Sequence, residues 1–89
     1  MVEFRLLYSK QALKDAKKLS SVQLDKKAKI LLSIIRSDPF QNPPPYEKLV
    51  GNLSGAYSRR INIKHRLVYE VRESDKVVRI LRMWSHYGE

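Results

Sequence analysis

Hydrophobic and polar residues alternate at the start of the chain. From Val2 to Tyr8 the apolar side chains fall on every second position, with Glu3 and Arg5 between them. This period predicts a strand with one buried face. Ser9 follows directly, and serine is a favoured residue at the N-cap of a helix. The first element is therefore predicted to be a strand over residues 2–8, with a helix beginning after Ser9.

The pattern then changes to helical spacing. Apolar residues recur every three or four positions in two stretches, which predicts two amphipathic helices. The positions that define their buried stripes are Ala12, Ala16 and Leu19 in the first, and Leu24, Ala28, Leu31 and Ile35 in the second, widened by Ile30, Leu32 and Ile34. The second helix should end at Asp38-Pro39, because proline disfavours helical geometry in the residue before it. A short turn between the two predicts a helical hairpin.

The second half of the chain predicts strands. Residues 37–55 hold all four prolines and two of the three glycines, which is typical of a loop. Three alternating segments follow at 57–62, 66–72 and 77–84, the last two joined by a polar turn at 73–76. The order β-α-α-β-β-β predicts one α+β domain over residues 1–89, in which the helical hairpin packs on a mainly antiparallel, four-stranded sheet.

The composition restricts the class of protein. The chain has 89 residues and no cysteine, which excludes disulfides, thiolate zinc sites and cysteine nucleophiles. No apolar run approaches the roughly 20 residues of a membrane helix, and no signal peptide is recognisable. We therefore expect a cytoplasmic protein. The two histidines, scattered acids and three glycines match no metal-ligand or phosphate-loop spacing, so neither metal nor cofactor is expected.

The charge balance indicates the kind of partner. Eighteen Lys and Arg residues against nine Asp and Glu give a net charge of +9. Such an excess favours binding to nucleic acid, an anionic membrane surface or an acidic protein. The lysines of the two helices are also explained as a solvated surface, so charge alone does not identify the partner.

Two arginines are placed to bind an anion. Arg60 and Arg66 lie on successive predicted strands, where both side chains would project from the sheet face opposite the helices. Like charges that meet on a sheet favour an anion between them, and guanidinium groups match phosphate oxygens in pairs. A pair of solvated arginines is the simpler alternative.

Two further residues are candidates for proton transfer. Histidine as a residue type titrates near neutrality, so His86 could serve as a general acid or base, although a histidine this close to a chain end is often only a surface residue. Glu47 is one of few acids in a basic chain, although on its own this carboxylate indicates little. His65 is expected to serve turn packing or to face solvent. Together, Glu47, Arg60, Arg66 and His86 suggest the acid, base and phosphate clamp of a metal-free RNA cleavage.

Three segments carry a resemblance to a known family. Residues 52–61 read NLSGAYSRRI, residues 65–69 read HRLVY, and His86-Tyr87 stands near the end. This combination resembles the YoeB/Txe branch of the RelE toxin superfamily over nearly the whole chain. Members are toxins of type II toxin–antitoxin systems that enter the ribosomal A site and cleave mRNA there without a metal.

The resemblance implies roles for individual residues. Glu47 matches the general base and His86 the general acid, while Arg66 matches the arginine that stabilises the phosphate transition state. Arg60 matches a further phosphate contact, and Tyr87 the aromatic residue beside the acid, a candidate for base stacking.

The chain also departs from the family pattern. The family usually has a lysine three residues after the glutamate, where this chain has Val50. Lys48 is the nearby candidate phosphate contact, although it faces a different way if the segment is extended. Gly88 and Glu89 follow the tyrosine at which the family's chains commonly end.

The resemblance also implies partners. We expect the ribosome and mRNA, a cognate acidic antitoxin of the Phd/YefM type, no membrane, and either a homodimer or a toxin–antitoxin hetero-oligomer. Two alternatives remain open at this point. One is a non-catalytic toxin or binding module of the RelE/ParE fold, acting on another target such as DNA gyrase. The other is an inactive relative that binds only its antitoxin.

Overall fold

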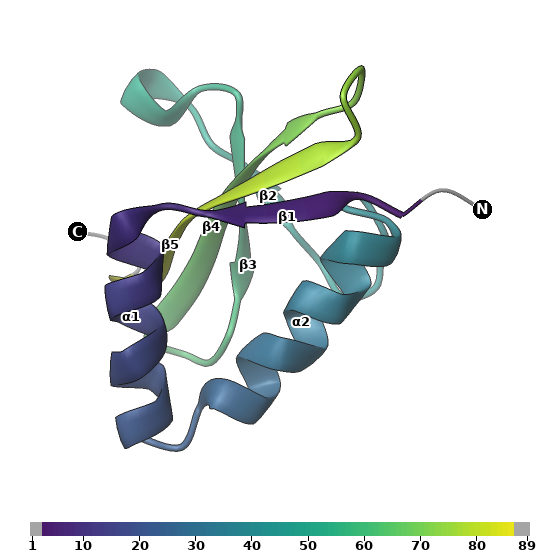
Figure 1. Ribbon diagram of the computed structural model, residues 1–89. Coiled ribbons are helices and arrows are strands. Elements are labelled where there is room, and N and C mark those ends of the chain that lie inside the picture. Colours follow the sequence, from purple (N-terminus) through teal and green to yellow (C-terminus); the bar gives the residue numbers. More distant parts are fainter. Residues whose placement is uncertain (1–2, 87–89) are drawn as a thin grey trace.

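Two helices pack on one face of a five-stranded sheet in the computed structural model, which describes residues 3–86 (Figure 1). The elements in chain order are β1 (Arg5–Tyr8), α1 (Lys10–Ser21), α2 (Asp25–Ser37), β2 (Glu47–Lys48), a 3₁₀ turn (Gly51–Leu53), β3 (Ala56–Arg60), β4 (His65–Arg72) and β5 (Val77–His86). The strands follow the spatial order β1-β5-β4-β3-β2, with β1 parallel to β5 and every other pair antiparallel. The predicted α+β class and helical hairpin on a mainly antiparallel sheet are confirmed.

The number of strands was predicted wrongly. The sheet has five strands because Glu47–Lys48 forms the short strand β2 within the segment predicted as a loop. Glu47 pairs with Ser58 and Lys48 with Tyr57, so β2 lies at the edge of the sheet beside β3. Two residues are too few to show an alternating pattern, and only the tertiary register with β3 makes them a strand.

Helix boundaries follow the local signals. Ser9 caps α1, because its hydroxyl oxygen accepts a hydrogen bond of 3.0 Å from the backbone N–H of Ala12. Helix α2 ends at Ser37, and Asp38 before Pro39 is extended, as the proline requires. The apolar stripe of α2 is narrower than predicted, since Ile30 is 62% exposed.

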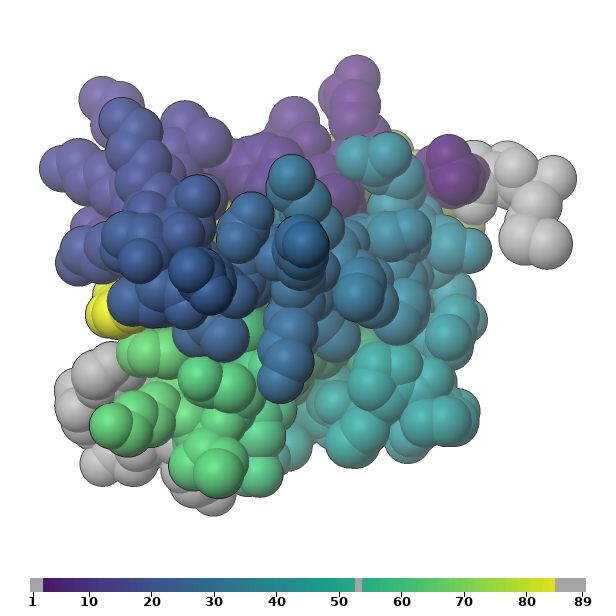
Figure 2. Space-filling view, turned by 90° about the horizontal axis from the view of Figure 1, so that it is seen from below, coloured from purple at the N-terminus to yellow at the C-terminus, as the bar shows by residue number. Residues whose placement is uncertain are grey.

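The hydrophobic core lies between the helices and the sheet. From the helices it takes Ala12, Leu19, Ala28, Leu31 and Ile35, and from the strands Leu67, Tyr69, Val78, Ile80 and Met83, with Ile61 beside them. Figure 2 shows α1 and α2 covering the helix side of the molecule, with the segment that follows α2 lying next to that helix. The opposite sheet face therefore carries the residues that alternate with the core positions, among them Arg66 and Ser58. Within residues 3–86, no helix is long and apolar enough to cross a bilayer.

Candidate active site

The two candidate arginines are direct neighbours across β3 and β4. Register pairs Arg60 with Arg66, so their side chains leave the sheet on the same face. Arg60 is exposed, whereas Arg66 is 6% exposed. The predicted juxtaposition of two guanidinium groups is present, and one of the two is held within the protein.

The edge strand β2 brings Glu47 to this pair. A nitrogen of the Arg66 guanidinium (Nη1) donates to Glu47 Oε1 at 3.1 Å and to Ser58 Oγ at 3.1 Å. The Glu47 side chain is 56% exposed. An ion pair that solvent reaches on one side contributes little to stability. The contact is better understood as a way of orienting both groups, with the carboxylate still open to a substrate.

A small pocket lies between these side chains. Its volume is about 230 Å³, and its lining residues are Pro45, Tyr46, Glu47, Ser58, Arg60 and Arg66. One carboxylate and two guanidinium groups therefore face the same space. That space has the donors to bind a phosphate and an acceptor for a proton.

Lys48 lies apart from this pocket. It pairs with Tyr57, whereas Glu47 pairs with Ser58, so the two side chains of β2 leave on opposite faces of the strand. The structure thus brings together Glu47, Arg60 and Arg66 of the predicted residues, but not Lys48.

The end of β5 approaches the same region. Ser85 pairs with Arg66, and His86 pairs with His65. The backbone of His86 therefore directly follows Ser85, the residue that faces Arg66. The side chain of His86 and the whole of Tyr87 lie outside the described residues. His65 was expected in a turn or in solvent, but it begins β4, is 7% exposed and stacks on Trp84 with ring centroids 4.0 Å apart.

A buried aspartate that the sequence patterns did not reveal holds this end of β5. Asp15 of α1 is fully buried, and its Oδ2 accepts hydrogen bonds from the N–H groups of Met83 (3.0 Å) and Trp84 (3.1 Å) and from Arg82 Nε (3.1 Å). Strand β5 bulges at this point, because the three steps from Arg82 to Ser85 lie opposite only two steps on β4, from Val68 to Arg66. A bulge interrupts the regular pairing of backbone groups, so the strand needs support from elsewhere. Asp15 satisfies the amide groups at the bulge.

The environment of Asp15 favours its charged form. Burial alone would raise the pKa of Asp15, but the hydrogen bonds from the Met83 N–H, from Gln11 and from Arg82 outweigh burial and lower that pKa below its ordinary value. The signal in the sequence was a carboxylate within the apolar stripe of the first helix, between Ala12 and Leu19. A charged residue there has to be paired once the helix packs.

A second residue of this kind is Arg59, which lies on the opposite face of β3 from Arg60. Arg59 is 1% exposed, and its guanidinium contacts the loop between α2 and β2. The alternation of β3 had placed Arg59 with the apolar residues Tyr57 and Ile61. An arginine at a core position was therefore the available signal.

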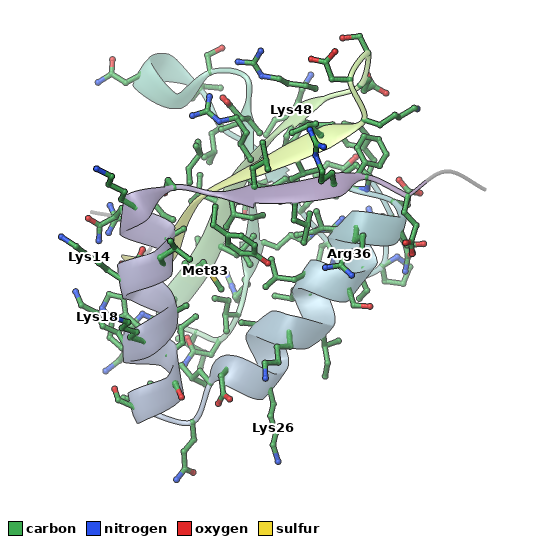
Figure 3. All side chains as sticks on the ribbon, in the orientation of Figure 1. Lys14, Lys18, Lys26, Arg36, Lys48 and Met83 are labelled. Atoms are coloured by element: carbon green, nitrogen blue, oxygen red, sulfur yellow. The ribbon has the colours of Figure 1, made fainter. Side chains whose placement is uncertain are left out.

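The remaining positive charge is spread over the outer surface. Figure 3 shows Lys14 and Lys18 projecting from α1, and Lys26 from α2, away from the sheet. Among residues 3–86 no three histidine or acidic side chains come together in a way that could hold a metal ion. The groups that line the pocket, a carboxylate and two guanidinium groups, can accept a proton and stabilise negative charge.

Comparisons with a family model and with known proteins point to the same family. Residues 4–87 match the YoeB-like toxin of bacterial type II toxin–antitoxin systems. Toxin YoeB of a Synechocystis strain is 43% identical over 56 residues, which are 63% of this chain and 65% of the relative. Toxin YoeB of Escherichia coli K12 is 40% identical over 62 residues, 70% of this chain and 71% of that protein. The aligned part thus spans about two thirds of each relative.

Solved structures agree with the sequence relatives. The YoeB/ParE toxin from Agrobacterium tumefaciens superposes with a TM-score of 0.84 at 26% identity, covering 94% of this chain and all of that one. A YoeB–YefM complex from Staphylococcus aureus contains a chain with a TM-score of 0.78 at 38% identity, covering 94% and 98% of the two chains. Sequence match and fold together show that the chain belongs to the family of YoeB-like toxins of bacterial type II toxin–antitoxin systems.

Proposed function

We propose that this toxin is a ribosome-dependent endoribonuclease that cleaves mRNA in the ribosomal A site without a metal ion. The observation that carries the proposal is the pocket in which Glu47 and two paired arginines, Arg60 and Arg66, face the same space. Family membership adds support, because YoeB and RelE toxins are ribonucleases in general. A binding surface alone has no need of a carboxylate in the same pocket as two guanidinium groups.

The chemistry follows from the groups present. Glu47 takes the proton from a ribose 2′-hydroxyl, whose oxygen attacks the adjacent phosphorus. Arg66 and Arg60 stabilise the negative charge that accumulates on the phosphoryl oxygens. The bond from phosphorus to the 5′ oxygen breaks, and His86 gives that oxygen a proton. The products are a 2′,3′-cyclic phosphate and a 5′-hydroxyl end. Tyr87 is proposed to stack on a base beside the cut.

Partners follow from the charge and from the relatives. The net charge of +9 favours ribosomal RNA through a salt-sensitive attraction. We further propose a cognate acidic antitoxin of the YefM type, in line with the YoeB–YefM complex among the relatives. A disordered acidic segment that folds over the arginines would block RNA from the pocket. The YoeB dimer from Staphylococcus aureus makes a homodimer the matching proposal for the free toxin.

The test uses ribosomes paused on a defined mRNA. Wild-type protein should cut within the A-site codon, and Glu47→Gln and His86→Ala should each lower the rate by roughly 10²–10⁴-fold while remaining folded. The matched control is Glu70→Gln. This change removes the carboxylate of a different ion pair on the same sheet, between Glu70 and Arg79, and the variant should cut mRNA as the wild type does. Wild-type protein that binds these ribosomes without cutting the mRNA would favour a non-catalytic toxin.

A further inference from the structure

Arg59 is a buried cation that donates hydrogen bonds to uncharged oxygens. Its Nη2 donates to the carbonyl of Pro39 at 3.1 Å and to that of Gln41 at 2.9 Å, and its Nη1 to that of Pro44 at 2.6 Å. Its Nε donates to the hydroxyl of Tyr69 at 3.1 Å. Four of the five N–H groups of a guanidinium are thus used, three of them on one loop.

The loop between α2 and β2 needs an outside donor. It contains all four prolines of the chain, which have no backbone N–H to offer. Its carbonyls therefore lack the regular partners of a helix or strand, and buried carbonyls must be satisfied elsewhere. Arg59 supplies several donors from one rigid fork, and Tyr69 adds a hydrogen bond of 2.9 Å to the Pro39 carbonyl.

This loop leads directly into the proposed catalytic base. The guanidinium carbon of Arg59 lies 5.1 Å from the ring centroid of Tyr46, and Tyr46 packs edge-on against Tyr57 at 5.8 Å. Glu47 is the next residue, at the first position of the two-residue strand β2. So short a strand has little pairing of its own to fix where it lies.

We propose that Arg59 is a positioning residue, which fixes the loop so that Glu47 is held against Arg66 at the pocket. Its effect on the reaction rests on the proposed function, but its effect on the loop does not. Arg59 lies beneath the loop on the helix side of β3, whereas the pocket lies on the other side, so it acts on the reaction only through Glu47.

The first test is a double-mutant cycle on the paused-ribosome cleavage rate at saturating ribosomes. Arg59→Lys keeps the charge but replaces the fork with a single ammonium group, and it should lower the rate at least tenfold. In a Glu47→Gln background the same change should lower the residual rate less than threefold, because the group being positioned is already absent.

A matched control separates positioning from general destabilisation. Leu19→Ala opens the core beneath α1, away from the loop, and lowers the melting temperature without touching β2. Assayed well below its melting temperature, this variant should cut at nearly the wild-type rate, even if it is less stable than Arg59→Lys. Equal rate losses from Arg59→Lys in both backgrounds, or a rate loss from Leu19→Ala as large as that from Arg59→Lys, would overturn the proposed role.

A second measurement does not depend on activity. The backbone N–H of Leu49 donates to the carbonyl of Ala56 at 2.9 Å and reports whether the segment holding Glu47 stays docked. Its hydrogen exchange should be at least tenfold faster in Arg59→Lys, whereas that of Leu67 in β4 should change less than threefold. Unchanged exchange at Leu49 would overturn the inference. A wild type that exchanges as expected but cuts no RNA would instead overturn the proposed function and, with it, the role in catalysis.

Discussion

At the scale of single residues, the polar groups of the candidate site differ in how far they are buried. Arg66 is buried and oriented by Ser58 and Glu47, while Arg60 and Glu47 remain open to solvent. The face that carries them was predictable, because alternation along two strands assigns each side chain to one face of the sheet. The contact between Glu47 and Arg66 was not, since it depends on a two-residue strand without a sequence signal of its own.

Asp15 gives a prediction of pH dependence at this scale. Its folded-state pKa is lowered, so its stabilising contribution is complete above the ordinary value of 3.8 and is lost as the pH falls through that value toward the folded pKa. Asp15→Asn should lower the free energy of unfolding by about 2–3 kcal/mol near pH 7, because a charged acceptor of several hydrogen bonds is replaced by a neutral amide.

Urea unfolding at several pH values between 3 and 7 measures this contribution. The difference between wild type and Asp15→Asn should shrink below about pH 4. Asp75→Asn, in the exposed turn before β5, is the control and should change stability by no more than about 0.5 kcal/mol. A stability difference for Asp15→Asn that stays constant over this pH range would show that Asp15 does not act through its charge.

At the scale of elements, the helices and the longer strands were predictable and the irregular segments were not. Periodicity identified α1 and α2 because their buried positions, such as Leu19 and Ile35, repeat at helical spacing. The loop after α2 and the bulges of β5 are instead fixed by Arg59 and Asp15, which bind backbone groups far away in the chain. Sequence patterns are local, so they do not reveal which distant carbonyl or amide such a side chain reaches.

Ser9 links two elements and yields a prediction of its own. Its hydroxyl accepts from Ala12 N–H at the start of α1 and donates to the carbonyl of Leu81 in the bulged part of β5 at 2.8 Å. Ser9→Ala removes both hydrogen bonds and should cost about 2 kcal/mol of stability. Ser21→Ala, which removes an exposed hydroxyl at the other end of α1, should cost less than about 0.5 kcal/mol. If chemical denaturation showed similar losses of stability for Ser9→Ala and Ser21→Ala, the linking role of Ser9 would be contradicted.

At the scale of the whole molecule, the positive charge has two parts. Arg60 and Arg66 line the pocket, whereas Lys14, Lys18 and Lys26 project from the helices on the other side of the sheet. Composition alone predicted a polyanionic partner. It did not predict that the arginines of the pocket and the lysines of the helices would lie on opposite sides of the sheet, because that depends on how the helices pack. The family match and the fold then identify a toxin of the YoeB-like family.

The helix lysines should contribute to RNA affinity in a salt-dependent manner. Changing Lys14, Lys18 and Lys26 together to glutamine should weaken ribosome binding and flatten the dependence of log affinity on log salt, by up to about one unit of slope for each phosphate that the toxin no longer neutralises. The corresponding arginine variant keeps the charge and should bind nearly as the wild type does. Binding that is insensitive to the glutamine changes would place the ribosome on another face.

The most direct test of the central claim replaces a single hydroxyl group in the RNA. Paused ribosomes are prepared with mRNA that carries either a normal ribose or a 2′-deoxyribose at the nucleotide preceding the cut, and the products of wild-type toxin are analysed by their ends. Attack by the 2′-hydroxyl predicts cleavage of the normal mRNA to a 2′,3′-cyclic phosphate and a 5′-hydroxyl, and no cleavage at the deoxy position. Equal cleavage of both RNAs, or binding with cleavage of neither, would contradict the account.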